Sequence, residues 1–491
     1  MGTRFWLLPS ASAPGHEGSA ALHPSAKLVD NAANGPLMTA KPSAPTPRGT
    51  AVEVLCLWAT THNSIDSLFQ SAVSQLADID RGLAKSLVYG VLRQKQFLDY
   101  IIRGFSKHPL TKMKPRTLMT LRIGVYQLLF LRRMPESAAV NATVNTLKAA
   151  GQPAWLIGFV NGLLRGVARN RAALPTPEEL AGADPPILNH PAWLTDRWQT
   201  RFGTETTWTI CCSNNSDPCL TLRINSRRTS VPVMKTVLTK TGIISHKGLY
   251  SPSALRIDNF PGSIAALPGY EQGHFQVQDE AAQLATLLVG PLPDRCRVLD
   301  GCAGLGGKTS HLAELLPPGG SIVAVEPEPR RFGLLRENLN RLGLTEQVRC
   351  VRSDLQTYAT TRPQPFDAIL IDAPCSGTGV IRRQPDIRWN RHPEDLARYQ
   401  RNQLHLLETA ASLLKPGGVL VYATCSLEAE ENEETVQLFL QRCPRFAVEN
   451  AADFVPEPAR RLVDASGFFR TTPADEIDGF FAARLIEPRG L

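Results

Sequence analysis

The chain has 491 residues, which is too long for one ordinary domain and predicts two or three. Apolar residues make up 43% and charged residues 20%, and no apolar run approaches the roughly 20 residues of a membrane helix, so a globular protein with no membrane partner is expected. Ten cysteines in this length exclude a disulfide-dense scaffold and favour reduced thiols in the cytoplasm.

The net charge of +8 is placed unevenly along the chain. Residues 51–170 hold 15 Lys and Arg against 6 Asp and Glu, so the basic excess belongs to this part. Such an asymmetry predicts contact with a polyanion, with nucleic acid as the first candidate. A solvated basic face without a ligand is the alternative that charge alone leaves open.

The N-terminal part divides into a tail and a helical region. Residues 1–50 contain 26 Ala, Pro, Ser or Gly without periodicity, which predicts a disordered tail, and Met38 within it is an alternative start. Residues 51–170 are predicted to be all-helical because apolar residues recur at three- and four-residue steps. The runs that show this spacing are Leu83–Phe105, Leu118–Leu131 and Ala138–Ala150.

A proline-rich stretch and a small mixed segment follow. Five prolines between positions 175 and 191 predict a linker over residues 171–214. Residues 215–274 are predicted to be a small mixed α/β segment that joins the linker to the last domain. Its two strand-like runs are Leu220–Asn225 and Gly242–Leu249.

Residues 275–491 alternate buried strands with helices, which predicts a doubly wound, mostly parallel α/β sheet of Rossmann-like type. The predicted strands are Val298–Leu299, Ile322–Val325, Gln347–Val351, Phe366–Ile371 and Val419–Ala423, the last after a Lys415-Pro416-Gly417-Gly418 turn. The predicted helices are Ser310–Leu316, Arg330–Leu342 and Asp395–Leu414. In such sheets ligands bind outside the carboxyl ends of the strands.

A glycine loop follows the first of these strands. It reads Asp300-Gly301-Cys302-Ala303-Gly304-Leu305-Gly306-Gly307-Lys308-Thr309 and opens a helix. Its glycines allow a tight turn and a close approach of backbone to a ligand, but they do not fit the Walker phosphate loop. Glu326 ends the second strand, where an acid accepts hydrogen bonds from ribose hydroxyls, and Asp354 after the third strand is a candidate for an adenine amino group. This order is the one expected for S-adenosylmethionine.

Two cysteine loops end the fourth and fifth strands, Asp372-Ala373-Pro374-Cys375 and Ala423-Thr424-Cys425-Ser426. A thiolate that adds to C6 of a pyrimidine turns C5 into a nucleophile able to take a methyl group. Asp372, protonated during addition, is a candidate hydrogen-bond partner for N3 of the base. No metal is expected, because the loose group Cys211, Cys212 and Cys219 is not followed by partners at zinc-site spacing.

With these motifs the chain resembles the RNA 5-methylcytosine methyltransferases of the Nop2/Sun (RsmB, Fmu) family over roughly residues 215–487. The glycine loop, both cysteine loops and Arg382-Arg383-Gln384-Pro385-Asp386 carry the resemblance. Residues 51–170 resemble the NusB-like RNA-binding domain of the bacterial small-subunit enzyme. The resemblance implies a monomeric S-adenosylmethionine-dependent cytosine-C5 methyltransferase that acts on RNA, with 16S ribosomal RNA as the first candidate.

The resemblance also implies roles for single residues. Cys425 would be the nucleophile and Cys375 would assist product release. Cys302, Ala303, Gly304, Leu305, Gly306, Gly307, Lys308, Glu326, Asp354 and Asp372 would contact S-adenosylmethionine or the target base. The chain departs from the family at Gly304-Leu305, where Ala-Pro is usual, which predicts a looser loop and weaker cofactor binding. Glu326 stands where Asp is usual.

Three other functions are weighed against this one. DNA cytosine-5 methyltransferases use the cysteine of the Pro-Cys loop and lack the Thr-Cys loop, so Cys425 favours RNA. A transfer-RNA enzyme and a non-catalytic RNA-binding factor remain as alternatives. Arg382, Arg383 and Arg388 are candidates for phosphate contacts or for solvated surface positions, and Trp389 for base stacking or packing.

Overall fold

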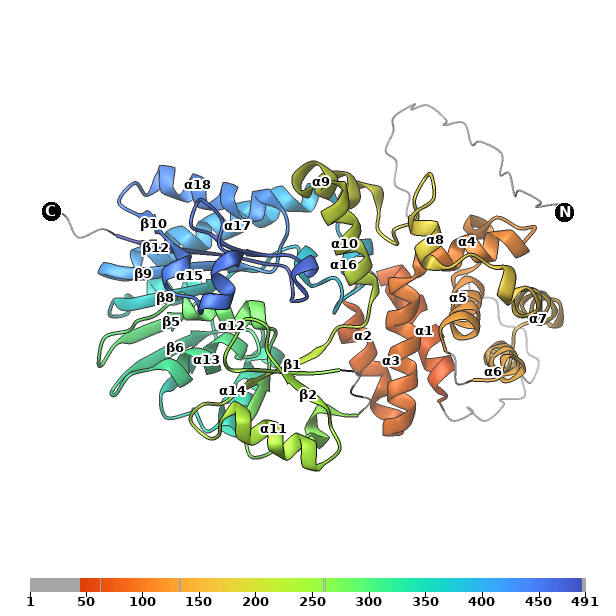
Figure 1. The fold of residues 1–491 in the computed structure, drawn as a ribbon, viewed down its shortest axis with the longest axis horizontal. Coiled ribbons are helices and arrows are strands. Elements are labelled where there is room, and N and C mark those ends of the chain that lie inside the picture. Colours follow the sequence, from red (N-terminus) through yellow and green to blue (C-terminus); the bar gives the residue numbers. More distant parts are fainter. Residues whose placement is uncertain (1–44, 62, 132–133, 259, 261, 488–491) are drawn as a thin grey trace, which may run out of the picture. The chain divides into compact units, whose positions relative to one another are not determined.

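The computed structural model describes residues 45–487, apart from 62, 132, 133, 259 and 261. From Pro45 onward they belong to one compact unit (Figure 1). Most of the predicted tail, with Met38, lies outside the described residues. Residues 47–50, predicted to be disordered, instead begin the first helix, where Thr50 packs inward.

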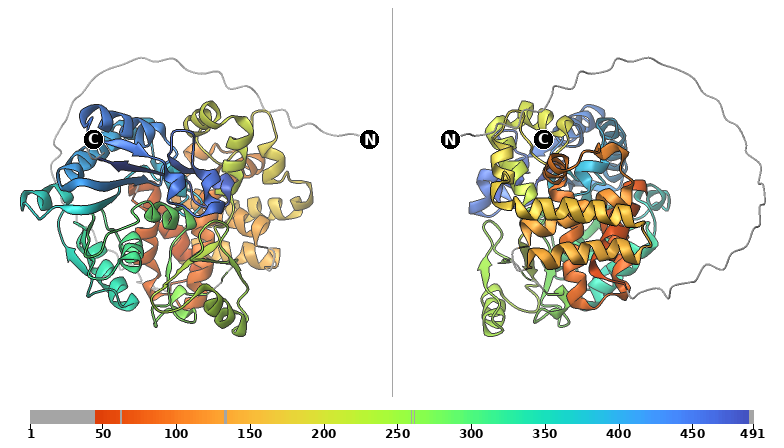
Figure 2. Two further views of the ribbon diagram at one scale, coloured as in Figure 1. Left: turned by 60° about the vertical axis from the view of Figure 1, so that its left-hand side comes forward. Right: turned by 90° about the vertical axis from the view of Figure 1, so that its right-hand side faces the viewer.

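The described part of 51–170 is helical, as predicted. Prolines set several of the helix starts, since Pro115 is the first residue of one helix and Pro135 and Pro153 directly precede two others. The predicted run Leu83–Phe105 is broken at Gln94, whose ψ of 19° leaves the helical range. The helices are α1 (Pro47–Thr61), α2 (Ile65–Ala72), α3 (Asp78–Arg93), α4 (Lys95–Phe105), α5 (Pro115–Phe130), α6 (Glu136–Ala149) and α7 (Ala154–Arg169). Of these, α6 and α7 lie side by side (Figure 2).

Part of the predicted linker is folded. Residues 171–214 contain α8 (Pro177–Ala181), α9 (Ala192–Phe202) and most of α10 (Thr204–Asn215). The prolines lie between or at the starts of these helices, where a missing N–H costs nothing. Trp198 on α9 is fully buried, and its Nε1 donates to Glu428 Oε1 at 3.0 Å. This packing against the C-terminal domain is what orders a stretch with little helical signal of its own.

The small mixed segment is an antiparallel sheet with one helix. Its strand order is β2-β3-β1-β4, and it runs a few residues beyond the predicted end at 274. Inward residues such as Leu222, Leu255 and Phe275 form its core with Leu238 of the helix. The elements are β1 (Leu220–Ile224), α11 (Val231–Lys240), β2 (Ser245–Lys247), β3 (Ala254–Ile257) and β4 (Phe275–Val277).

The C-terminal domain is the predicted doubly wound sheet. Its strands run in the order β10-β12-β9-β8-β5-β6-β7, with β11 paired to β12. Neighbours from β7 to β9 are parallel, whereas β12, which begins directly after Asp478-Gly479, is antiparallel to β9. The strands are β5 (Arg297–Asp300), β6 (Ser321–Val325), β7 (Val348–Val351), β8 (Phe366–Asp372), β9 (Leu414–Thr424), β10 (Ala447–Glu449), β11 (Phe469–Thr471) and β12 (Phe480–Ile486).

Alternate residues of these strands enter two separate cores, one on each face of the sheet. Val298 and Leu370 belong to one core, whereas their neighbours Leu299 and Ile371 belong to the other. Burial on both faces explains why the strands read as continuous apolar runs. The covering helices are α12 (Glu280–Leu287), α13 (Gly307–Leu315), α14 (Pro329–Leu342), α15 (Leu355–Thr360), α17 (Pro393–Ser412) and α18 (Glu433–Arg442). The short helix α16 (Ile387–Asn390) packs elsewhere, since Ile387 shares a core with Leu194 and Trp198 of α9.

One predicted turn is absorbed into a strand. Lys415-Pro416-Gly417-Gly418 lies within β9, where the register with β8 jumps from Phe366↔Leu414 to Ala368↔Val419. The extra residues form a bulge, and the strand continues to Thr424, next to Cys425. No helix among the described residues is long and apolar enough to cross a membrane.

Candidate active site

The glycine loop joins β5 to α13 at the carboxyl edge of the sheet. Gly306 has φ +84°, and a Cβ there would come within 2.7 Å of a Leu335 methyl carbon, so only glycine fits. Asp300 holds the two ends of the loop together, because it accepts from Thr309 Oγ1 at 2.6 Å and from the Cys302 backbone N–H at 3.3 Å. Burial raises the pKa of Asp300 to about 6.

Both predicted cofactor acids lie at this edge, and both also bond to protein groups. Glu326 follows β6, is buried, and accepts from the backbone N–H of Gly304 and of Glu328, each at 2.9 Å. Asp354 follows β7 and caps α15 by accepting from the Thr357 backbone N–H at 2.7 Å. Glu326 therefore shapes the glycine loop directly, and contacts of either acid with a ribose or an adenine stay predictions.

The glycine loop and the first cysteine loop are joined by an ion pair. Lys308 Nζ, in the first turn of α13, donates to Asp372 Oδ2 at 2.6 Å, where Asp372 ends β8. The Lys308 ammonium also lies 4.8 Å from the centre of the Phe480 ring. The structure thus places Asp372 between the two loops, and its contact with N3 of a base stays a prediction.

The two predicted thiols meet. Cys375 Sγ and Cys425 Sγ lie 3.3 Å apart, and both cysteines are free. The hydrogen bond to Cys425 is the largest cause that raises the pKa of the Cys375 thiol, and burial adds to it. The raised pKa keeps Cys375 as a thiol, which is able to donate across the 3.3 Å gap to Cys425 Sγ.

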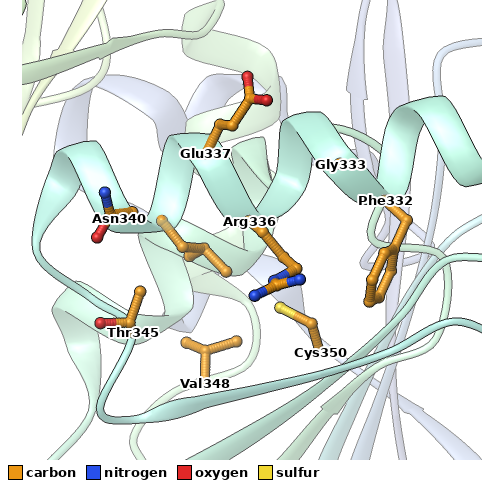
Figure 3. Close-up of a pocket in the computed structure, with 9 residues that line it drawn as sticks. Phe332, Gly333, Arg336, Glu337, Asn340, Thr345, Val348 and Cys350 are labelled. Carbon is orange, nitrogen blue, oxygen red and sulfur yellow. The ribbon is translucent and has the colours of Figure 1, made fainter.

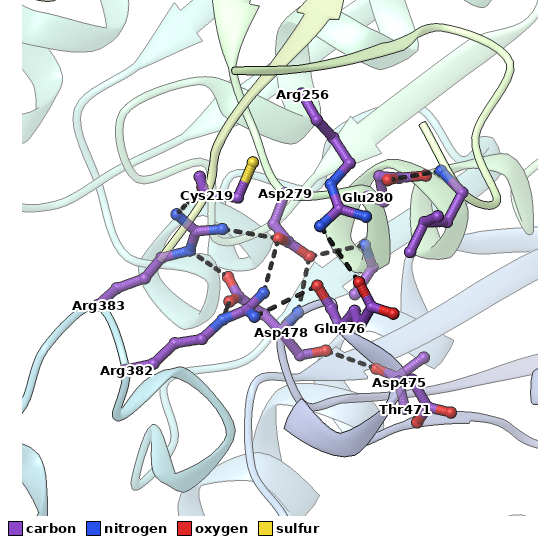
Figure 4. Close-up of polar contacts among 12 residues, drawn as sticks. Cys219, Arg256, Asp279, Glu280, Arg382, Arg383, Thr471, Asp475, Glu476 and Asp478 are labelled. Carbon is purple, nitrogen blue, oxygen red and sulfur yellow. Dashed lines mark hydrogen bonds and ion pairs between the residues drawn. The ribbon is translucent and has the colours of Figure 1, made fainter. Parts of the chain in front are cut away.

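The arginines that follow the first cysteine loop are paired with carboxylates. Arg382 and Arg383 point toward Asp279 and Asp478 and pair with both (Figure 4). The Arg383 bonds are 2.6 Å to Asp478 Oδ2 and 2.7 Å to Asp279 Oδ2. Burial lowers the pKa of Arg383, but the two carboxylates outweigh burial and raise it. These arginines fasten the last strand's turn to the residue that caps α12. They are therefore not free surface residues, and their carboxylate partners leave the phosphate role without support.

Arg388 and Trp389 are structural as well. Arg388 is fully buried and donates to the carbonyl oxygens of Asn189 and Asn214 and to Asn215 Oδ1. Trp389 packs on the helical domain and donates from Nε1 to the Leu92 carbonyl at 2.8 Å. The packing interpretation of Trp389 is the correct one.

Two residues near the site, Glu431 and Arg223, were not predicted from the sequence. Glu431 accepts hydrogen bonds from Ser376 and Ser426, the residues that follow the two cysteines. Arg223 of β1 is fully buried and donates to the Gly307 carbonyl oxygen at 2.7 Å, so the small sheet holds the glycine loop from behind. The sequence feature that could have identified Glu431 is the repeated Cys-Ser pair, with an acidic residue a few positions after the second pair.

A cavity elsewhere is not part of this site. It has a volume of about 750 Å³ and lies between α14 and β7, at an edge of the sheet. Figure 3 shows Phe332, Arg336 and Cys350 pointing toward one another in it. It contains none of the predicted site residues. Among the residues that the structure describes, no three His, Cys, Asp or Glu side chains are grouped so as to hold a metal ion.

Comparison with known proteins decides the family. Residues 287–486 match the family described as 16S rRNA methyltransferase RsmB/F, residues 190–263 its ferredoxin-like domain, and residues 45–169 the NusB family. A probable ribosomal RNA small subunit methyltransferase B of Bacillus subtilis is 33% identical over 451 residues, which are 89% of this chain and 98% of the relative. The chain belongs to the RsmB/F family of 16S rRNA methyltransferases.

Further comparisons agree with membership of the RsmB/F family. The ribosomal RNA small subunit methyltransferase B of Salmonella enteritidis is 34% identical over 442 residues, which are 90% of this chain and 98% of the relative. The crystal structure of PH0851 covers 91% of this chain and all of its own, with a TM-score of 0.72 and 24% identity, which shows a shared fold. This chain is therefore an rRNA methyltransferase, so the interpretation as a non-catalytic RNA-binding factor is wrong.

Proposed function

We propose that this RsmB/F-family enzyme transfers a methyl group from S-adenosylmethionine to C5 of a cytosine in 16S ribosomal RNA, with Cys425 as nucleophile and Cys375 as the group that assists release. The observation that carries the proposal is the 3.3 Å separation of the two sulfurs at the edge of the sheet that also carries the glycine loop. Ribosomal RNA as the substrate implies a cytoplasmic enzyme.

The residues at this edge fit S-adenosylmethionine, which when bound supplies an electrophilic methyl group. The backbone around Gly304 is open, since no atom lies within 4 Å of the place where a Cβ would stand. Glu326, Asp354 and Asp372 offer carboxylate oxygens to ribose hydroxyls, to an adenine amino group and to the positive sulfonium. Residues 302–308, with Lys308 paired to Asp372, would line the remaining side of this site.

The first chemical step is assigned to Cys425. Its thiolate forms a bond to C6 of the cytosine, and the electrons of the C5=C6 bond move to C5, which then takes the methyl group. In this proposal Cys375 is the donor in the contact between the two sulfurs, and its hydrogen bond stabilises the attacking thiolate. Asp372, in its protonated form, would donate its proton to N3 of the cytosine and so draw electron density from the ring as C6 is attacked.

The release step is assigned to Cys375. Once Cys425 is a neutral thioether, the main cause that raises the pKa of Cys375 is removed, because that cause is the Cys425 sulfur itself. The Cys375 thiol then gives up its own proton to solvent more readily, and the thiolate that forms is the base. It takes the C5 proton, the C5=C6 double bond re-forms, and the bond from C6 to Cys425 breaks. The two thiols therefore act in sequence.

The test compares two single substitutions on RNA from a deletion strain. Cys425→Ala should abolish both methylation and the covalent protein–RNA adduct, whereas Cys375→Ala should accumulate an adduct that is visible on a denaturing gel. An adduct with Cys425→Ala would overturn the assignment of the nucleophile. Bisulfite sequencing of total RNA tests the substrate, and loss of methylation at a transfer-RNA cytosine with 16S sites unchanged would overturn 16S ribosomal RNA as the target.

A further inference from the structure

The two cysteine loops meet a second time, one residue beyond the thiols. Each cysteine is followed by a serine, and Ser376 Oγ lies 3.0 Å from Ser426 Oγ. Both hydroxyls donate to the same oxygen, Glu431 Oε2, with Ser426 Oγ at 2.5 Å. The other oxygen, Oε1, accepts from the Ser376 backbone N–H at 2.8 Å and from Gln403 Nε2 at 3.0 Å. One carboxylate therefore holds both loops.

This carboxylate is costly to bury and is fully enclosed. Glu431, Ser376 and Gln403 have no exposed surface. A buried carboxylate is tolerated where several donors satisfy it, and here four hydrogen bonds do so. Burial raises the pKa of Glu431 in spite of these bonds. A group that costs folding energy at this position needs a reason other than stability.

The neighbours of Glu431 hold the residues on either side of each cysteine. Asn432 Oδ1 accepts from Thr424 Oγ1 at 2.5 Å, and its Nδ2 donates to the Ser426 carbonyl at 2.9 Å, so Cys425 is held from both sides. Gln403 Nε2 also donates to the Pro374 carbonyl at 3.1 Å. With Ser376 bound to Glu431, Cys375 is held from both sides as well.

We propose that Glu431 is a positioning residue that sets the distance between the Cys375 and Cys425 sulfurs and thereby controls product release. The proposal rests on the proposed function, since it gives Glu431 a task only if the two thiols act in sequence. Glu431 touches neither sulfur and acts through Ser376 and Ser426. We call the hydrogen bonds from Ser376 and Ser426 to Glu431 the clamp. If the clamp is loosened, Cys425 can still attack, but Cys375 no longer reaches the proton at C5.

Glu428 provides a matched control three residues earlier. Its side chain is equally buried, but it accepts from Arg197 Nε at 2.9 Å and from Trp198 Nε1 at 3.0 Å. It therefore fastens α9 to the C-terminal domain and does not bond through its side chain to either serine. Glu428→Gln and Glu431→Gln remove the same charge from neighbouring sites with different partners.

The experiment compares these two variants in methyl transfer and in adduct formation. In Glu431→Gln an amide NH₂ replaces Oε2 and cannot accept from the two serine hydroxyls. Turnover should fall by on the order of 100-fold with the KM for RNA unchanged, because the loss is one of geometry after binding. The adduct should accumulate although Cys375 is present. Glu428→Gln should accumulate no adduct.

A second measurement reads the sulfur separation without RNA. Phenylarsine oxide captures two neighbouring thiols as a cyclic or bridged dithioarsenite, with two S–As bonds formed and one water released. The wild-type protein should be captured, Cys375→Ala should not be captured through this pair, and Glu431→Gln should be captured more slowly. Ser426→Ala removes one arm of the clamp with little change of volume, and should behave likewise if Glu431→Gln does not fold.

The outcomes separate the two proposals. If Cys375→Ala forms no adduct, the proposed function fails, whatever Glu431→Gln does. If Cys375→Ala forms the adduct but Glu431→Gln and Ser426→Ala do not, the function stands and the clamp is wrong. The clamp is also overturned if the activity of Glu431→Gln falls only in proportion to its folded fraction while arsenical capture stays at the wild-type rate.

Discussion

Lys308 Nζ lies 2.6 Å from Asp372 Oδ2, so an ion pair joins the first turn after the glycine loop to the strand that leads into the first cysteine loop. Lys308 is buried, and Asp372 is about one-third exposed. The side that would hold the cofactor and the side that would hold the base are therefore coupled through one contact. The effect of a substitution at either residue should therefore depend on whether the other residue is intact.

The coupling can be measured with a double-mutant cycle. Lys308→Met and Asp372→Asn should each lower kcat/KM, and the double variant should lose less than the sum of the two. A coupling free energy of about 1–2 kcal/mol is expected for groups in direct contact. Steady-state kinetics on 16S RNA fragments give kcat/KM for the wild type, the two single variants and the double variant. Strictly additive losses would show that the ion pair is incidental.

Arg223 should matter for the cofactor as well as for stability. Arg223→Met leaves the buried Glu314 carboxylate without its guanidinium partner, which now lies at 2.8 Å, and should cost roughly 3–5 kcal/mol of unfolding free energy. Adding Glu314→Gln removes the unpaired charge and should restore most of that stability. The double variant still lacks the donor to the Gly307 carbonyl, so its affinity for S-adenosylmethionine, measured by calorimetry, should stay weak. Recovery of affinity together with stability would contradict this role.

The sequence predicted the sheet because both of its faces are buried. Val298 and Leu299 face different cores, so no alternation interrupts the apolar run, and the glycines and cysteines that follow such runs must share the carboxyl edge of a parallel sheet. The meeting of Cys375 and Cys425 follows from that rule, since β8 and β9 are adjacent and parallel.

Other features depend on tertiary contacts that local patterns do not encode. Helix α10 is rich in Thr, Cys and Asn, which are indifferent helix formers, and α9 and α10 are ordered by packing on the C-terminal domain. The partners of Arg383 lie 95 and 104 residues away, so a basic pair next to a site was read as a phosphate contact. Glu431 was missed because its role needs two loops that are 50 residues apart.

Gly304 should tolerate alanine sterically but not conformationally. No atom would meet the new Cβ, yet φ is +55°, where an L-residue costs roughly 1–2 kcal/mol. Although Ala is usual in the family at this position, the observed φ means that Gly304→Ala should weaken S-adenosylmethionine binding by about fivefold or more, measured by calorimetry. Tighter binding would instead support the expectation that glycine makes the loop too loose. Gly158→Ala in α7 is the control, since it is equally open but helical and should leave cofactor binding unchanged. Unchanged affinity in Gly304→Ala would mean that the loop adjusts without cost.

The salt dependence of RNA binding tests the corrected role of Arg383. A phosphate contact contributes about 0.7–0.9 to the slope of log K against log salt concentration. Because Arg383 is committed to Asp279 and Asp478, Arg383→Gln should leave this slope unchanged and lower the melting temperature instead. Filter binding at several salt concentrations, with a thermal melt of the same sample, gives both values. A shallower slope with an unchanged melting temperature would restore the phosphate interpretation.

The buried ammonium of Lys95 lowers the free energy of unfolding by an amount that depends on pH. Burial lowers the pKa of Lys95 to about 8, with a further lowering from Arg122, although its ammonium lies 4.2 Å from the centre of the Trp389 ring. Its ordinary pKa is 10.5. Between these values the unfolded chain holds a proton that the native protein has released, so stability rises with pH in this window and the full cost of the buried charge is present below about pH 8.

Removal of the charge should remove that dependence. Lys95→Met keeps the length of the side chain and loses the ammonium, so it should stabilise the protein at pH 7 by on the order of 2–3 kcal/mol, less whatever the ring contact contributes. Its advantage over the wild type should shrink as pH rises from 8 toward 10.5. Urea unfolding followed by circular dichroism across this range measures both proteins under the same conditions. A difference in stability that stays constant from pH 7 to pH 10.5 would show that Lys95 does not titrate in this window.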